Sequence, residues 1–320
     1  MAQMRYLVTG GAGFLGSNLV NAILERNLGT VTVLDNFATG RREHFGKWIN
    51  ETRLTIVAGD VADYNTVVNA MPSHDVVIHL AANSDIARAV SAPLIDFENG
   101  TRLTQTVLEA MRTTGVKRIM FTSGSGVYGD VPQEPIPEDY AHMIPISTYG
   151  ASKLASETLI SAYCHMFDFV GTVFRFANVV GPNMTHGVTH DFIHRLHANP
   201  SRLQIFGDGN QSKPYIHADD VVAAMLFILA RQTNGYEYYN VSTEDTLLVR
   251  DIAEIVVTEL ELTDVKYEFS GGARGWRADV PIYRLDSSKI RRLAWRTQRS
   301  SREAVVAAVR SLIEEIATAI

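Results

Sequence analysis

Tyr149 and Lys153 are the residues of this chain whose types and spacing most directly allow chemistry. They stand four residues apart, and on a helix this spacing places both side chains on one face. A phenol titrates near ~10, which is too high for a base at neutral pH, but a neighbouring cation favours the phenolate and lowers that pKa. The pair is therefore a candidate general base for removing a hydroxyl proton. The alternative is a surface tyrosine and lysine that share a helix face by chance, and for a lone motif this short the alternative is favoured.

A glycine-rich turn near the N-terminus favours the catalytic interpretation of Tyr149 and Lys153 over a chance pairing. Glycines stand at positions 10, 13 and 16, after the apolar run Tyr6–Thr9 and before a predicted helix. Glycines in this context allow a tight turn, close approach of the backbone to a pyrophosphate, and close packing of a helix on a sheet. The N-terminus of the helix adds N–H donors for an anion. The spacing is GxxGxxG, whereas the commonest dinucleotide fingerprint is GxGxxG.

Asp35 supports the same interpretation, since it ends a second predicted strand nineteen residues after Gly16. A carboxylate at this point accepts a hydrogen bond from an adenosine ribose 2′-OH and repels a 2′-phosphate, so it favours NAD over NADP. Arg41 and Arg42 are the counter-evidence, because arginines can hold a 2′-phosphate; we interpret them as surface loop residues. A capping or turn aspartate is the alternative for Asp35.

The elements that must position these residues alternate between strand and helix. Apolar runs predict strands at 6–9, 31–35, 54–57, 76–80, 118–121 and 173–176, and helices at 14–24, 99–114 and from Tyr149 to about 167. This alternation predicts an α/β fold with a doubly wound parallel sheet covered on both faces. After Asn178 the pattern becomes irregular, with helices expected at 219–231, 249–260 and 301–316. A smaller mixed α/β unit is expected there, with a border that interleaves with the first.

Composition excludes several other classes. The chain has 320 residues, 46% of them hydrophobic, and a net charge of −6, which is ordinary for a globular protein and gives no support for nucleic-acid binding. No apolar run reaches the length of a membrane span and no secretory segment is recognisable, so a cytoplasmic location is expected. The single cysteine, Cys164, excludes an intrachain disulfide, and the histidines show no metal-ligand pattern, so no metal site is expected.

The order of these motifs along the chain is typical of a known protein family. With the glycine turn, Asp35, residues 79–82 (HLAA), residues 127–129 (VYG) and the Tyr149/Lys153 pair, the chain resembles the extended short-chain dehydrogenase/reductase family. More narrowly, it is similar to the nucleotide-sugar branch and, within that, to the UDP-glucose (UDP-galactose) 4-epimerases. The resemblance extends through residues 176–182, 207–209 and 274–276. It implies a Rossmann-type NAD-binding domain over residues 1–178 and a nucleotide-sugar domain over 179–320.

The resemblance also implies roles for individual residues. Tyr149 would be the catalytic base and acid, and Lys153 would lower its pKa and bind the nicotinamide ribose. The contacts implied for a tightly bound NAD are Gly10, Gly13, Phe14, Leu15, Gly16, Asp35, Asn36, Asp60, Val61, Leu80, Ala81, Ala82, Asn99, Tyr149, Lys153 and Phe176.

The chain departs from the family at residue 124. These enzymes usually carry Ser or Thr four residues before Tyr128, where this chain has Gly124 between Ser123 and Ser125. Neighbours on a strand point to opposite faces, so neither serine replaces the missing hydroxyl automatically. Glycine makes this loop flexible enough to bend one of them inward. We expect Ser123 or Ser125 to contact the substrate.

The same segment bears on the reaction. Related 4,6-dehydratases carry Asp-Glu directly before the VYG motif and related decarboxylases carry Glu, whereas this chain has Ser125 and Gly126. Reversible oxidation at C4 of the sugar, and hence 4-epimerisation of a UDP-hexose, is the expected chemistry. A 4-epimerase of UDP-glucuronate or another nucleotide sugar is one alternative. A non-catalytic NAD(P)-binding sensor is another, although such sensors typically lack the Tyr-Lys pair.

The resemblance further implies contacts on the substrate side. Asn178, Lys213, Arg274 and Arg277 would contact the diphosphate, and Asp279 the uridine ribose; Pro214 stands where the family often has Asp. Bulky Tyr283 favours UDP-glucose and UDP-galactose over N-acetylated sugars. Ser84 and Asp85 are expected near the sugar or phosphates. A homodimer is expected, formed by helices near 92–113 and 149–167.

Overall fold

A seven-stranded parallel sheet is the largest sheet in the computed structural model, which describes residues 3–84, 86–131 and 134–319. The strand order is β11-β6-β5-β4-β1-β2-β3. The strands are β1 (Met4–Thr9), β2 (Gly29–Asp35), β3 (Leu54–Ala58), β4 (Val76–His79), β5 (Arg118–Gly124), β6 (Val170–Phe176) and β11 (Tyr236–Val241). Val8 of β1 pairs with Val33 of β2 and with Ile78 of β4, so these three apolar strands lie side by side, with β4 in the middle of the sheet. The predicted α/β fold class is confirmed, and this order is that of a dinucleotide-binding sheet with one added strand.

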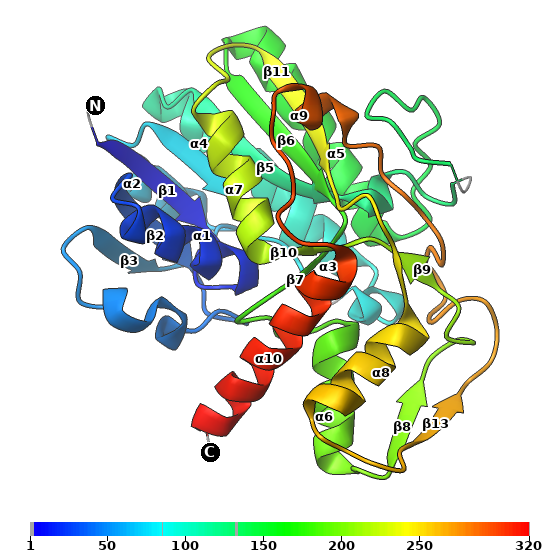
Figure 1. Ribbon diagram of the computed structural model, residues 1–320. Helices are drawn as coiled ribbons and strands as arrows, with labels where there is room; N and C mark the ends of the chain where they lie inside the picture. Colours follow the sequence, from blue (N-terminus) through cyan, green and yellow to red (C-terminus); the bar gives the residue numbers. More distant parts are fainter. Residues whose placement is uncertain (1–2, 85, 132–133, 320) are drawn as a thin grey trace. The chain divides into compact units, whose positions relative to one another are not determined.

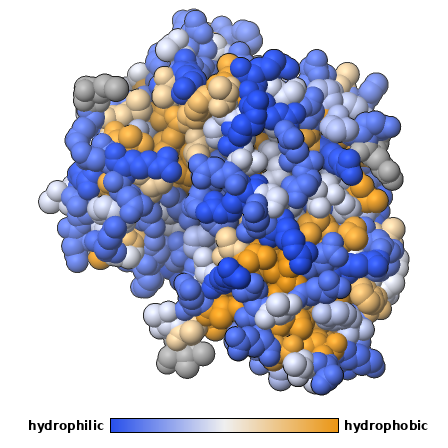
Figure 2. Space-filling view, in the orientation of Figure 1, coloured by the Kyte–Doolittle hydropathy of each residue, from blue (hydrophilic) through white to orange (hydrophobic). Residues whose placement is uncertain are grey.

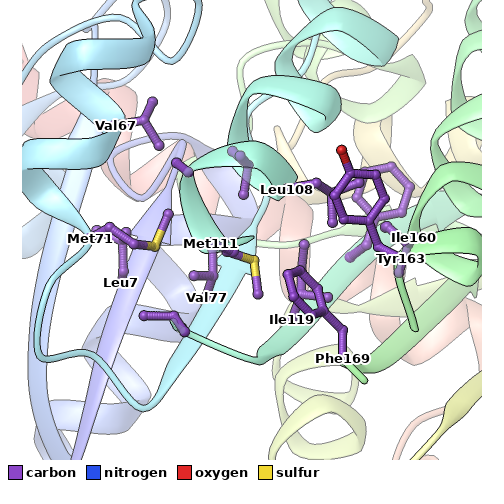
Figure 3. Packing of buried hydrophobic residues seen from close by; sticks show 14 of the residues in the cluster. Leu7, Val67, Met71, Val77, Leu108, Met111, Ile119, Ile160, Tyr163 and Phe169 are labelled. Atoms are coloured by element: carbon purple, nitrogen blue, oxygen red, sulfur yellow. The ribbon is translucent and has the colours of Figure 1, made fainter. Parts of the chain in front are cut away.

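Helices flank this sheet (Figure 1). They are α1 (Phe14–Glu25), α2 (Tyr64–Ala70), α4 (Arg102–Thr114) and α5 (Thr148–Phe167). The short helix α3 (Leu94–Asp96) contacts α5, and α7 (Ala218–Leu229) follows later in the chain. Figure 3 shows how α2, α4 and α5 pack on one face of the sheet: Met71, Met111 and Ile160 gather over strand residues Val77 and Ile119. All of these side chains are buried, and each large apolar side chain buried in this way contributes about 1.5–3 kcal/mol.

The start of α4 differs from the sequence-based expectation. A helix was expected from Asn99, but residues Phe97–Thr101 form a single π-helical turn and α4 begins at Arg102. Gly100 lies so close to Ser152 of α5 that a Cβ atom there would come within 2.2 Å of the serine Oγ. The π turn therefore accommodates a close approach between two elements that are distant in sequence.

The described residues also form three two-stranded sheets, all built from segments that follow Phe176. They pair β10 (Tyr215–His217) with β7 (Asn178–Val180), β12 (Leu247–Leu248) with β9 (Ser212–Lys213), and β13 (Lys266–Phe269) with β8 (Arg202–Ile205). Three helices in this part of the chain, α6 (Val188–Ala198), α8 (Val249–Glu259) and α10 (Ser301–Ala319), contact one another, and α9 (Ser288–Arg292) is short. Figure 2 shows a largely hydrophilic surface with apolar areas over this helix group.

Two compact units interleave along the chain. One consists of Met1–Val127, Thr148–Arg175 and Met225–Tyr239, and the other of Tyr128–Ser147, Phe176–Ala224 and Asn240–Ile320. The expected domain boundary near residue 178 stays a prediction. No helix in the described ranges combines the length and apolar character needed to cross a membrane.

Candidate active site

The glycine turn after β1 is shaped by backbone contacts that only glycine permits. Gly10 has φ +68°, and a Cβ atom there would lie 2.7 Å from the Ala81 nitrogen. A Cβ atom on Gly16 would lie 2.3 Å from the Gly10 carbonyl oxygen. These two glycines therefore allow β1, α1 and the end of β4 to meet closely.

Gly13 has a different reason to lack a side chain. It is the N-cap of α1 and provides no side-chain cap, and a Cβ atom there would approach only the Gly10 carbonyl oxygen, at 3.3 Å. This one contact would be tight, but no other atom of the described residues, the adjacent ones aside, comes within 4 Å of the position, which directly precedes Phe14 and Leu15 of α1. An uncapped helix N-terminus with a clear approach is a site for an anion such as a pyrophosphate.

Asp35 joins this turn to the loop after β2. Its side chain is 7% exposed; Oδ2 accepts from the Ala12 amide at 2.9 Å and Oδ1 from the Phe37 amide at 2.8 Å. Each carboxylate oxygen keeps a further lone pair, so the geometry leaves acceptors for a ribose hydroxyl. The neighbouring Asn36 donates to Asp60 Oδ2 at 3.0 Å, which orders the next loop.

The remaining predicted cofactor residues are placed mostly around this sheet. The Leu80 amide donates to the Thr9 carbonyl at 3.0 Å, which ties the end of β4 to β1. Asn99 is exposed, and its carbonyl accepts from the Asn83 amide at 2.8 Å. The others are Val61, 4% exposed; Ala81 and Ala82, half-buried after β4; and Phe176, 5% exposed at the end of β6. Arg41 and Arg42 are exposed, in agreement with a surface loop.

Lys153 is buried on the first turns of α5, only 5% exposed. Its Nζ donates to the Thr122 carbonyl at 2.8 Å and lies 4.8 Å from the centre of the Phe121 ring and 5.6 Å from that of Tyr149. Burial lowers the pKa of Lys153 to about 8, although the carboxylates of Glu157 and Asp96 oppose that shift. The i,i+4 spacing therefore does place Tyr149 and Lys153 on one face, as predicted.

The predicted lowering of the Tyr149 pKa is wrong for the chain by itself. Burial of the phenol raises its pKa to about 12, and the negative charge of Asp96 adds to the increase. The physical reason is that a phenolate is a poorly solvated anion here, and Lys153 directs its ammonium group to a carbonyl of β5. The protein's own residues hold Tyr149 protonated.

Ser123 is the predicted hydroxyl whose surroundings point to a ligand. It lies in β5 with 6% exposure, and its Oγ is buried without a hydrogen-bond partner among the described residues. Ser125 begins the short 3₁₀ turn η4 (Ser125–Val127) and is half-buried. This turn packs on α5, since a Cβ atom on Gly126 would lie 3.7 Å from the Gly150 Cα. Buried polar groups are normally paired, so an orphan hydroxyl calls for an explanation.

Two of the cations predicted to contact a nucleotide diphosphate, Lys213 and Arg274, pair with carboxylates of the second unit. Lys213 forms an ion pair with Asp279, which also accepts from the Gly275 amide at 3.0 Å. The Arg274 guanidinium contacts both carboxylate oxygens of Asp130, at 3.1 and 2.9 Å. No sequence pattern marked Asp130, whose pairing spans 144 positions.

Asn178 and Tyr283 also meet within the second unit. The Tyr283 hydroxyl donates to Asn178 Oδ1 at 3.3 Å, and the tyrosine is only 4% exposed. Arg277 is exposed and Ser84 is half-buried, while Asp85 lies outside the described residues. Within the described ranges, no group of three or more His, Cys, Asp or Glu side chains is arranged to hold a metal ion.

Comparison with known proteins agrees with this geometry. Residues 6–242 match the model of the NAD dependent epimerase/dehydratase family. A UDP-glucose 4-epimerase of Mycolicibacterium smegmatis is 33% identical over 96% of this chain and 97% of its own length. The solved UDP-glucose 4-epimerase of Thermus thermophilus in complex with NAD shares 30% identity over 97% of this chain and 99% of that chain, with a TM-score of 0.86. A dTDP-glucose 4,6-dehydratase of Streptomyces venezuelae, solved with NAD, has 28% identity, 98% coverage of both chains and a TM-score of 0.90.

These matches define the class of the protein. The chain belongs to the NAD dependent epimerase/dehydratase family, and it is an NAD-dependent nucleotide-sugar epimerase. The predicted family, enzyme class and cofactor are thereby confirmed.

Proposed function

We propose that the protein interconverts UDP-glucose and UDP-galactose by transient oxidation at C4 of the hexose. The observation that carries the proposal is the grouping of Tyr149 and Lys153 on α5 with the Ser123 hydroxyl on β5. Tyr149 and Lys153 share a helix face, and the buried Oγ of Ser123 lies on the strand whose Thr122 carbonyl holds Lys153. The chain carries Ser125 and Gly126 where an elimination reaction would call for carboxylates.

The residues of the first unit fit NAD. The cleared approach to Gly13 and the N-terminus of α1 would hold its pyrophosphate, and Asp35 would accept from its adenosine ribose. Lys153 would contact the nicotinamide ribose. When bound, NAD supplies a hydride acceptor and, in its oxidised form, a positive charge.

Proton transfer falls to Tyr149 in this proposal. Tyr149 takes the proton of the C4 hydroxyl during oxidation and returns it during reduction, and Ser123 orients that hydroxyl. A general base works best when its pKa lies near the working pH. Since the chain raises the pKa of Tyr149 to about 12, cationic charge near the phenol must offset burial before the tyrosine can act as a base.

The second unit supplies the proposed nucleotide contacts. Lys213 and Arg274 carry the positive charge suited to a diphosphate, and guanidinium groups match phosphate oxygens well. Arg274 would exchange its contact with the exposed Asp130 for the ligand, because that ion pair is solvent-accessible and contributes little stability. Buried Tyr283, next to Asn178, supports a preference for hexoses without an N-acetyl group.

The direct experiment incubates the purified protein with UDP-glucose and with UDP-galactose and follows both sugars by chromatography. We expect each to form the other. UDP-glucuronate and UDP-N-acetylglucosamine are the matched alternatives, and faster epimerisation of either would replace the proposed substrate. Tyr149→Phe should lose turnover while retaining NAD, and full activity in that variant would remove Tyr149 from the mechanism.

We also propose that the protein acts as a cytoplasmic homodimer. Val90, Leu94 and Phe97 are 64%, 72% and 53% exposed. Leu94 and Phe97 lie in the segment near 92–113 that the family resemblance assigns to a subunit interface, and Val90 directly precedes it. Such a group of exposed apolar side chains is typical of an interaction surface. Light scattering of the purified protein measures the subunit number directly.

A further inference from the structure

Asp96 is a buried carboxylate that the proposed reaction does not use. It ends α3, is 1% exposed, and accepts two short hydrogen bonds: from Asn83 Nδ2 to Oδ1 and from Thr148 Oγ1 to Oδ2, each at 2.7 Å. Both oxygens accept, as an ionised carboxylate does. Among the described residues it forms no ion pair, so the groups that contact its carboxylate directly are neutral donors. A buried charge held in this way exerts its field on its neighbours with little screening.

The backbone of Asp96 completes a clamp on α5. Its carbonyl accepts from Ser152 Oγ at 2.7 Å, and the same Oγ accepts from the Thr101 amide at 2.9 Å. Thr148 and Ser152 are the residues on either side of Tyr149 along α5, one directly before it and one three positions after it. The absence of a side chain at Gly100 permits the approach. The π turn and α3 are thereby fixed to the first turn of the helix that carries Tyr149.

The charged groups around this turn come from several elements. Lys153 and Glu157 lie on α5, and Arg175 donates to both carboxylate oxygens of Glu157 in a buried ion pair. His79 of β4 is fully buried between two threonine hydroxyls, and burial together with the charge of Lys153 lowers its pKa to about 3, so it is neutral. Arg88 is exposed on the turn η2 (Ala87–Val90), and Glu98 pairs with Arg102 at the surface. Asp96 is therefore a buried carboxylate beside Tyr149 that makes no ion-pair contact with any described residue, and Lys153 is the buried cation on which its charge acts.

We propose that Asp96 is a positioning residue of the active site, which clamps the first turn of α5 and imposes its negative charge on Tyr149 and Lys153. This inference rests on the proposed role of Tyr149 as the base. The negative charge favours the protonated forms of both side chains, in agreement with the direction in which Asp96 acts on their pKa values. Replacing Asp96 with a neutral residue should therefore lower the pKa values of Tyr149 and Lys153. Both limbs of the pH–rate profile should then move to lower pH.

A direct titration of residue 149 tests the charge without any sugar substrate. Fluorotyrosine is incorporated at position 149, which brings the phenol into an accessible pH range, and its ionisation is followed by fluorine-19 NMR on the NAD-bound protein. Asp96→Asn preserves the shape and one acceptor, and we expect the phenol to titrate about 1 pH unit lower than with Asp96 present. Asp96→Ala is the second neutral variant and should give a shift in the same direction. Glu98→Gln is the matched control, an exposed carboxylate on the same segment, and should leave the titration unchanged.

Kinetic measurements separate the effect of the Asp96 charge from the effect of its hydrogen bonds to α5. Thr148→Val removes one hydrogen bond while Asn83 still holds the carboxylate, so it should lower kcat several-fold without moving the titration. Circular dichroism and retained NAD show whether Asp96→Asn and Asp96→Ala fold. If the phenol of residue 149 titrates at the unchanged pH in a variant that folds, the proposal is overturned. A shifted titration in a protein that epimerises no UDP-sugar would instead reject the proposed function and leave the effect of Asp96 standing.

Discussion

Replacing Lys153 with methionine should abolish turnover. It should also remove a pH-dependent destabilisation of the folded state, which comes from burying the ammonium group. The side chain is 5% exposed, and burial lowers its pKa from 10.5 to about 8. Each unit corresponds to 1.36 kcal/mol, so the buried ammonium costs roughly 3 kcal/mol when it is fully protonated. Methionine fills a similar volume without the charge.

The sign of the pH dependence follows from the two protonation equilibria. The unfolded chain keeps the lysine proton up to about pH 10.5, whereas the folded chain releases it above about pH 8. The wild type is therefore destabilised below about pH 8, and this cost fades as the pH rises between these values. Relative to Lys153→Met, the free energy of unfolding of the wild type should rise by about 2–3 kcal/mol between about pH 7 and about pH 10. The variant also loses the hydrogen bond to the Thr122 carbonyl, which costs about 1–3 kcal/mol at every pH. This loss shifts the stability difference between the two proteins by a constant amount and leaves its pH dependence unchanged.

Urea unfolding followed by circular dichroism at several pH values measures this difference. Both proteins should be freed of NAD, because a ligand that binds the folded state adds its own stabilisation. Lys47→Met is the matched control: its side chain is 68% exposed, so its removal should give no such slope. A constant stability difference between wild type and Lys153→Met across this range would refute the conclusion that the ammonium group is desolvated.

Three further predictions concern the hydroxyls, the cofactor and the assembly. Ser123→Ala should lower kcat about 10²-fold while leaving the free energy of unfolding unchanged or higher, because its buried Oγ has no partner among the described residues; Ser125→Ala, measured beside it, should have the smaller kinetic effect. Asp35→Asn should weaken NAD binding about tenfold or more and reduce discrimination against NADP, as measured by calorimetry, since one charged acceptor is lost beside two backbone amides. Leu94→Glu should convert the proposed dimer to a monomer in light scattering, and an unchanged mass would place the interface elsewhere.

Local sequence determined the cofactor turn because all its parts are contiguous. A strand, three spaced glycines and a helix start are consecutive along the chain, and the backbone contacts of Gly10 and Gly16 lie largely within that stretch or at the end of a neighbouring strand. The i,i+4 spacing of Tyr149 and Lys153 likewise fixed their common face before any packing was known. The parallel arrangement of the sheet followed from alternation of strands and helices, since parallel strands need crossover connections.

Only the tertiary structure decided how these residues behave. The pKa of Tyr149 is raised rather than lowered because burial and the carboxylate of Asp96 act on the phenol, and Asp96 lies more than fifty positions away in the sequence. The choice between Ser123 and Ser125 depends on which hydroxyl is buried without a partner among the described residues, and spacing along a strand carries no such information. Sequence periodicity reports which face a residue occupies, whereas desolvation and charge depend on which distant elements cover that face. The sequence by itself therefore determined the family and the candidate base, and the fold decided the charge and hydrogen-bond environment in which that base must work.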